Sequence, residues 1–102
     1  MPTSFAFEDL IVYQKARGFR RRVYKLVKLL PKEERYALAD QMRRAAISVT
    51  NNIAEGYGRF TFVDRVHFLR LSRDSVFELA DDLNVCEDEA YAKKQHLDDL
   101  RK

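Results

Sequence analysis

Apolar residues at helical spacing dominate the first third of the sequence and constrain its fold most strongly. Between Phe7 and Leu30 they recur at intervals of four and three residues, as Val12, Ala16, Phe19, Val23, Leu26 and Leu30. Side chains at these intervals lie on one face of an α-helix, so the spacing predicts one amphipathic helix over residues 7–30. Pro31 should end it, because the residue before proline avoids the helical conformation. Gly18 is expected to allow another helix to approach closely.

A second helix is predicted to open at Pro31, where a missing N–H costs nothing, with Glu33 and Glu34 near the positive end of its dipole. Small side chains at Ala39 and Ala46 should permit a tight interface between helices. Its apolar stripe is Leu38, Met42, Ala45, Val49 and Ile53. Gly56 and Gly58 are predicted to stop the helix.

The third helix should begin at Thr61, because Asp64 stands three residues later in the arrangement of a capping box. It is predicted to run to about Cys86 with the stripe Val66, Leu69, Val76, Ala80 and Leu83. A weaker pattern from Tyr91 to Arg101 predicts a fourth helix after a turn that no Gly or Pro marks. The expected fold is an all-α, antiparallel, up-and-down four-helix bundle with a short or incomplete fourth helix, in one domain spanning residues 1–102.

Charge is distributed unevenly along the chain. Residues 1–60 carry twelve Lys or Arg and six Asp or Glu, whereas residues 61–102 carry seven and ten. The basic half indicates either a site for a polyanion or complementary charges between neighbouring helices or subunits.

A row of cations follows the first predicted helix. Arg17, Arg21, Lys25 and Lys28 are spaced by four, four and three residues, which places them on one side of that helix. Such a row can neutralise successive phosphates, with Tyr13 or Tyr24 available to stack on an unpaired base. It can equally be an ordinary solvated face. The candidate nucleic-acid-binding residues are these four together with Arg20, Arg43, Arg44 and Arg59.

Catalytic and metal-binding patterns are poorly represented, so we expect no enzyme, no cofactor and no metal. Asp64 and His67 share a helix face and resemble one arm of a di-iron bundle site, but the sequence offers no second arm. Gly56-Tyr57-Gly58 lacks the preceding strand that a phosphate-binding loop requires. The single cysteine, Cys86, is expected to be a packing residue.

Large apolar residues outside the predicted stripes indicate self-association. They are Tyr13, Tyr24, Leu29, Phe68, Leu71, Phe77 and Val85, and a bundle of this size has little interior to hide them. No signal peptide and no apolar run of about 18 residues is present, so we expect a cytoplasmic protein that does not associate with membranes.

Several segments resemble one protein family. In chain order, the matching segments are Phe7-Glu8-Asp9-Leu10, Tyr13-Gln14-Lys15-Ala16, Leu30–Ala46, Ser48-Val49, Asn51–Arg59, Phe68–Arg73, Ser75 and Glu78-Leu79. Together these segments resemble the bacterial four-helix bundle proteins called S23 proteins. That family includes proteins encoded within intervening sequences of 23S ribosomal RNA genes, and it is similar to the accessory variability protein of diversity-generating retroelements.

The resemblance implies an antiparallel four-helix bundle that assembles into a ring-like homopentamer. It also implies a basic surface that contacts RNA or ribonucleoprotein. The alternative is a scaffold that binds a protein such as a polymerase or reverse transcriptase without touching nucleic acid. The sequence departs from the family at its C-terminal end, where Ala90-Tyr91-Ala92 replaces the expected turn and the last helix is short.

The family motif around the second helix end has two interpretations. In the structural one, Asn52 and Glu55 hydrogen-bond exposed backbone groups, while Gly56 and Gly58 supply positive φ for chain reversal. In the functional one, Arg59 holds a phosphate beside exposed amides.

Overall fold

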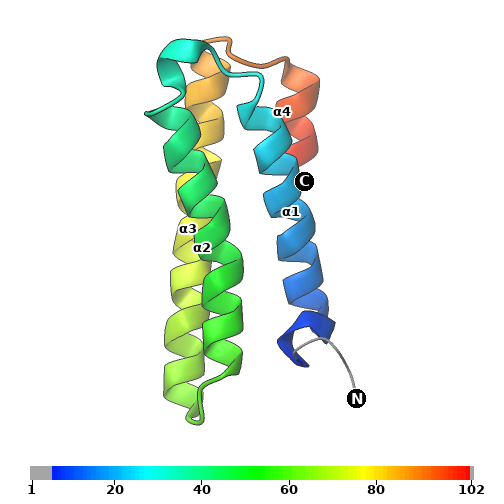
Figure 1. The fold of residues 1–102 in the computed structure, drawn as a ribbon, viewed down its shortest axis with the longest axis vertical. Helices are drawn as coiled ribbons and strands as arrows, with labels where there is room; N and C mark the ends of the chain where they lie inside the picture. The colour runs from blue at the N-terminus through cyan, green and yellow to red at the C-terminus, as the bar shows by residue number, and fades with distance from the viewer. Residues whose placement is uncertain (1–5, 102) are drawn as a thin grey trace.

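Four α-helices run alternately up and down in the computed structural model, which describes residues 6–101 (Figure 1). They are α1 (Ile11–Val27), α2 (Leu38–Tyr57), α3 (Phe62–Asp88) and α4 (Lys94–Arg101), with short 3₁₀ turns at Ala6–Asp9 and Lys32–Glu34. The helices α2 and α3 lie side by side over their length, and α4 covers only the upper part of α1. The predicted fold, including its short fourth helix, is confirmed.

The first helix is shorter than predicted at both ends. Leu10 is extended, with φ −67° and ψ 132°, and separates α1 from the preceding 3₁₀ turn. The Phe7 ring packs edge-on against Tyr13 at 5.1 Å, which holds that turn against the helix. At the other end, the amides of Leu29 and Leu30 donate to carbonyls three residues back, so the last turn tightens before Pro31. The helix predicted over residues 7–30 is therefore interrupted.

The second helix begins at Leu38 and not at Pro31. Pro31 leads into a 3₁₀ turn, and Ala37, with φ −121° and ψ −100°, breaks the chain direction before α2. Glu34 Oε2 accepts a hydrogen bond of 3.3 Å from the Leu38 amide, which is one of the unsatisfied donors at the helix start. The acidic residue predicted to lie inside the helix therefore supports its N-terminus from outside.

Thr61 caps the third helix as predicted, because its Oγ1 accepts a hydrogen bond of 3.1 Å from the Asp64 amide. The predicted core face of α3 is wrong. Its buried residues are Ser72, Ser75, Leu79, Asp82, Leu83 and Cys86. Only Leu83 belongs to the predicted stripe, while Leu69, Val76 and Ala80 are exposed.

Small side chains explain which face of α3 packs against α2. Ser72 Oγ donates to the Val49 carbonyl at 2.8 Å, and Ser75 Oγ donates to Ser48 Oγ at 2.9 Å. Gly56 lies so near α3 that a Cβ there would stand 3.2 Å from Phe68 Cβ and 3.3 Å from the Arg65 carbonyl oxygen. On the side of α3 that faces α2, close packing of the two backbones stabilises the fold more than the burial of branched side chains would.

The second helix ends at Tyr57 with Gly58 as its C-cap, as predicted, but the glycines do not supply the predicted positive φ or close approach. No glycine among the described residues has a positive φ, and Gly58 has φ −77°. A Cβ on Gly18 would meet only the end of the Arg22 side chain, at 4.0 Å, so no helix within residues 6–101 approaches it closely.

A left-handed alanine makes the turn between α3 and α4. Ala90 has φ 54°. The Tyr91 amide donates to the Cys86 carbonyl at 2.9 Å, and the Ala90 amide donates to the Glu87 carbonyl at 3.1 Å. These two hydrogen bonds form a Schellman motif, which usually holds glycine at the left-handed position. After it, α4 starts at Lys94 and buries Leu97 and Leu100 against the core.

Candidate nucleic-acid interface

The outer face of α1 carries the predicted row of cations. The inner face of α1 is buried at Ala16, Val23, Leu26 and Val27. Arg17, Arg21, Lys25 and Lys28, here called the basic ladder, are all exposed, and their helical spacing places them opposite that buried face. The ladder extends for about 17 Å along the helix axis, at 1.5 Å per residue.

The ladder has no carboxylate partner within the described part of the chain. Ion pairs within 4.0 Å involve Arg43, Arg44, Arg59, Arg73 and Arg101, and none involves a ladder residue. Among residues 6–101, no carboxylate lies within 4.0 Å of a ladder cation, and positive charge without a close partner favours phosphate binding with counterion release.

The other four predicted cations are engaged within the protein. Arg20 donates to Thr50 Oγ1 at 2.9 Å and joins α1 to α2. Arg44 pairs with Asp40 at 3.0 Å, and Arg43 bonds the Arg35 carbonyl at 3.3 Å and lies 3.9 Å from Asp40. The structure thus separates an unpaired ladder from cations that already have partners.

Arg59 belongs to the engaged group. Its guanidinium pairs with Glu55 at 3.1 Å and lies over the Phe68 ring, 4.6 Å from the ring centre. These contacts fasten the α2–α3 turn to α3, and they compensate the charge that a phosphate would require. Asn52 Nδ2 donates to the Ser48 carbonyl at 2.8 Å and to Ser48 Oγ at 2.9 Å, within the helix and not at its end. The predicted capping of exposed end groups by Asn52 and Glu55 is therefore wrong.

Of the two tyrosines near the ladder, Tyr24 is the better placed to stack on a base. It is partly exposed and lies three residues after Arg21 and four before Lys28, on the same side of the helix. Tyr13 packs against Phe7 and the core.

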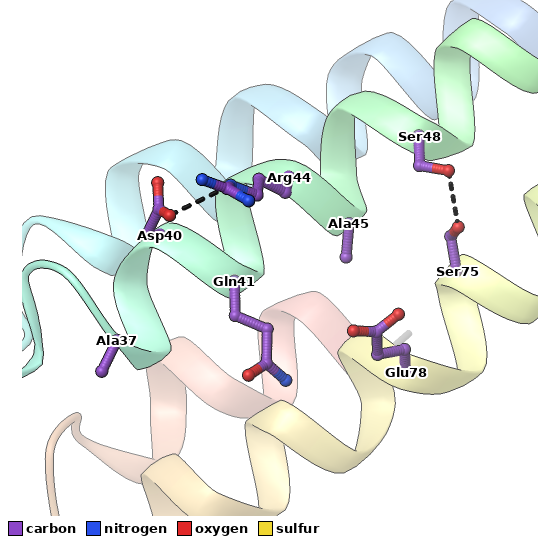
Figure 2. A pocket seen from close by; sticks show the side chains of 8 residues that line it. All are labelled: Ala37, Asp40, Gln41, Arg44, Ala45, Ser48, Ser75 and Glu78. Carbon is purple, nitrogen blue, oxygen red and sulfur yellow. Dashed lines mark hydrogen bonds and ion pairs between the residues drawn. The ribbon is translucent and has the colours of Figure 1, made fainter.

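A shallow cleft of about 320 Å³ between α2 and α3 contains the clearest cluster of polar side chains (Figure 2). In it Arg44 pairs with Asp40, and Ser48 bonds Ser75, while Gln41 and Glu78 line the cleft beside them. No histidine or cysteine lines this cleft, so its serines have no neighbouring imidazole base there. The serine hydroxyls join the two helices.

The remaining chemical candidates are separated from one another. His67 is exposed and packs edge-on against Phe68, and Cys86 is fully buried beside Met42. Burial is the main cause that raises the pKa of the Cys86 thiol to about 11, which fits the predicted packing role. Within residues 6–101 no three potential metal ligands gather at one place. In the same range, no helix combines the length and the apolar character needed to cross a membrane.

Sequence analysis missed an apolar surface at the α2–α3 turn. Phe60 is fully exposed, Phe62 and Val63 are 80% and 75% exposed, and Tyr57 is 44% exposed. We call these four residues the apolar tip. The signal was available in the sequence, since four large apolar residues within seven positions around Gly58-Arg59 are unusual in a solvated turn.

Comparison with known proteins adds one finding. The family model for 23S rRNA-intervening sequence proteins matches residues 8–102. No curated protein matches the chain.

Proposed function

Because the chain belongs to the 23S rRNA-intervening sequence protein family, we propose that it is a non-catalytic, homo-oligomeric module that binds RNA or ribonucleoprotein through the basic ladder. The observation that carries this proposal is the contrast between the ladder and the other predicted cations. The ladder residues are exposed and lack carboxylate partners among the described residues, whereas Arg20, Arg43, Arg44 and Arg59 have partners. The proposed place of action is the cytoplasm.

Phosphate contact explains this arrangement better than base-specific contact does. Lysine and arginine on a straight helix present charge to a backbone but carry little sequence information. Tyr24, the better placed of the two tyrosines near the ladder, can add stacking on an unpaired base. We therefore expect a preference for RNA with unpaired segments and a strong dependence on salt.

Self-association would multiply these contacts. Copies arranged in a ring, the homopentamer that the family resemblance implies, would each present one ladder to the same RNA. Several weak contacts acting together bind far more tightly than one.

Salt-dependent RNA binding tests the proposal. A fluorescent single-stranded RNA of about 20 nucleotides should bind with a log–log salt slope that changes by about 3 when Arg17, Arg21, Lys25 and Lys28 are all replaced by Gln, because four phosphate contacts are lost per chain. The matched control replaces four other exposed cations, Lys32, Arg70, Lys93 and Lys94, and alters net charge equally.

The control variant should keep most of the wild-type slope and affinity. Equal losses in the two variants would show that net charge alone attracts RNA, and would contradict a ladder interface. Binding that ignores salt would contradict it as well.

A further inference from the structure

A pocket lies between the first and the last helix, next to the basic ladder. The helices α1 and α4 are neighbours at the upper end of the bundle (Figure 1). Residues of α1, of the turn after it and of α4 enclose a cavity of about 320 Å³. This volume is in the range of pockets for small ligands, roughly 300–1,000 Å³. Lys25 belongs both to the ladder and to the pocket, so a strand that follows the ladder passes the pocket.

The pocket has an apolar floor. Leu26 and Leu100, which line it, belong to the core, and Leu29 beside them is 50% exposed. An apolar surface of this size suits a flat, weakly hydrated group such as an unpaired nucleobase. His96 lines the same pocket one helical turn before Leu100, and imidazole is a ring on which bases stack. The pocket can therefore hold a base that has left its stack.

Charged side chains of both signs surround this floor. Arg22 and Lys25 come from α1, and Asp99 comes from α4. All three are exposed, and none makes an ion pair within 4.0 Å in the part of the chain that the structure describes. Charge compensation within the protein therefore does not explain the acid in this basic surrounding. Its two oxygens remain available to accept hydrogen bonds from a ligand.

Guanine is the nucleobase that fits an exposed carboxylate best. Its Watson–Crick edge carries a ring N–H and an exocyclic amino group side by side, and a carboxylate can accept from both. On the same edge of adenine, cytosine or uracil, the one donor group stands beside an acceptor, which a carboxylate repels. The two cations at the pocket can neutralise the phosphate that adjoins the base.

We propose that this pocket binds an unstacked guanine of RNA, with Asp99 on the Watson–Crick edge of the base and with Arg22 and Lys25 on the adjoining phosphate. The inference rests on the proposed function, because the ladder brings the RNA to the pocket. It adds one base-specific contact to a surface that otherwise contacts the backbone. Free 5′-GMP has the same base and phosphate but cannot reach the rest of the ladder, so it should bind more weakly than RNA.

Two single-stranded RNAs of about 12 nucleotides test the proposal. Both are oligouridines, one with a single central guanine and the other with adenine at that place. In fluorescence anisotropy, the guanine RNA should bind roughly tenfold more tightly, as expected for one bidentate base contact. Asp99→Asn should abolish this preference, because an amide offers one acceptor and one donor in place of two acceptors. The position is exposed, so the fold should persist, as circular dichroism would verify.

Asp98→Asn is the matched control. It removes the same charge from α4, at an exposed carboxylate that lies 3.9 Å from Arg101 and does not line the pocket. Any general gain in RNA affinity from the lost negative charge should be equal in the two variants. The preference for guanine should persist in Asp98→Asn alone.

A ladder variant separates this inference from the proposed function. Replacing Arg17, Arg21 and Lys28 by Gln leaves Lys25 in the pocket. The variant should bind both RNAs more weakly and keep the ratio of their affinities. Unchanged affinity for both RNAs would contradict the ladder interface and leave the pocket standing.

Free nucleotides give a measurement that does not depend on the ladder. Added to the full chain, 5′-GMP should shift the NMR signals of His96 and Leu29, and 5′-AMP at the same concentration should not. Four results would overturn the inference: equal affinity for the two RNAs, a preference that survives Asp99→Asn, its equal loss in Asp98→Asn, or equal shifts with both nucleotides. Binding of 5′-GMP as tight as that of the guanine RNA would also overturn it, since the ligand would then be a free nucleotide.

Discussion

Asp82 is a buried carboxylate that the fold satisfies only in part. It is 4% exposed; Oδ1 accepts a hydrogen bond of 2.9 Å from Gln41 Nε2, and Oδ2 has no partner among the described residues. Burial, followed by repulsion from Glu78 and Asp81, raises the pKa of Asp82 from 3.8 to about 6, against the opposing effect of the Gln41 hydrogen bond. The folded protein therefore binds this proton more tightly than the unfolded chain does. The stabilisation that the bound proton gives the folded state is lost as pH rises through about 6.

Asp82→Asn should consequently stabilise the protein at neutral pH. The amide keeps an acceptor for Gln41 and carries no charge, so we expect a gain of about 1–3 kcal/mol at pH 7 in the free energy of unfolding. Below pH 3.8 the wild-type side chain is protonated in both states and the gain should vanish. Urea unfolding of both proteins at several pH values measures this. A difference that is constant with pH would contradict the assignment.

Among the helices and turns, the turn after α3 has alanine at a position where the backbone conformation favours glycine. Ala90 occupies the left-handed position of a Schellman motif at φ 54°, where a Cβ is strained. The turn nevertheless forms, because it directs α4 so that Leu97 and Leu100 are buried. Burial of two leucines outweighs a strain of about 1–2 kcal/mol.

Ala90→Gly should relieve this strain and raise the free energy of unfolding by about 1 kcal/mol, as measured by thermal or urea denaturation. Ala92→Gly is the matched control. Ala92 has no positive φ and packs against the core, so the same substitution there should destabilise. Equal effects at both positions would contradict a role for the left-handed conformation.

At the scale of the whole molecule, its two ends differ. The apolar tip lies at the α2–α3 turn, at the lower end of the bundle in Figure 1, and the α1–α2 connection lies at the upper end. Several large apolar residues gathered at one exposed turn favour contact with another protein surface. We expect the tip to take part in the proposed self-association.

Light scattering tests that expectation. Five copies of the 12.0 kDa chain would give a mass of about 60 kDa. Replacing Phe60 and Phe62 by Ser should lower the measured mass towards that of one chain. Tyr36→Ser, which removes an aromatic residue that is 87% exposed at the other end, should leave it unchanged. A monomeric wild-type protein would contradict both the tip and the ring.

Much of the fold could be predicted from local signals. Thr61 with Asp64 marked a helix start, and the stripe of α2 is buried at every predicted position from Leu38 to Ile53. The unpaired ladder was predicted as a row of charges. The sequence could not show that Arg20 and Arg59, unlike the ladder residues, have partners within the protein. Those partners, Thr50 and Phe68, lie on other helices.

Four helices, and the basic face of the first, follow from residues that stand within one or two turns of each other, so local pattern is enough to predict them. The side of α3 that faces the core depends instead on how α3 packs against α2. There Gly56, Ser72 and Ser75 let two backbones come close, and this contact turned the more apolar stripe outward. Packing between helices depends on the shapes of both partners, and periodicity along one helix does not contain that information.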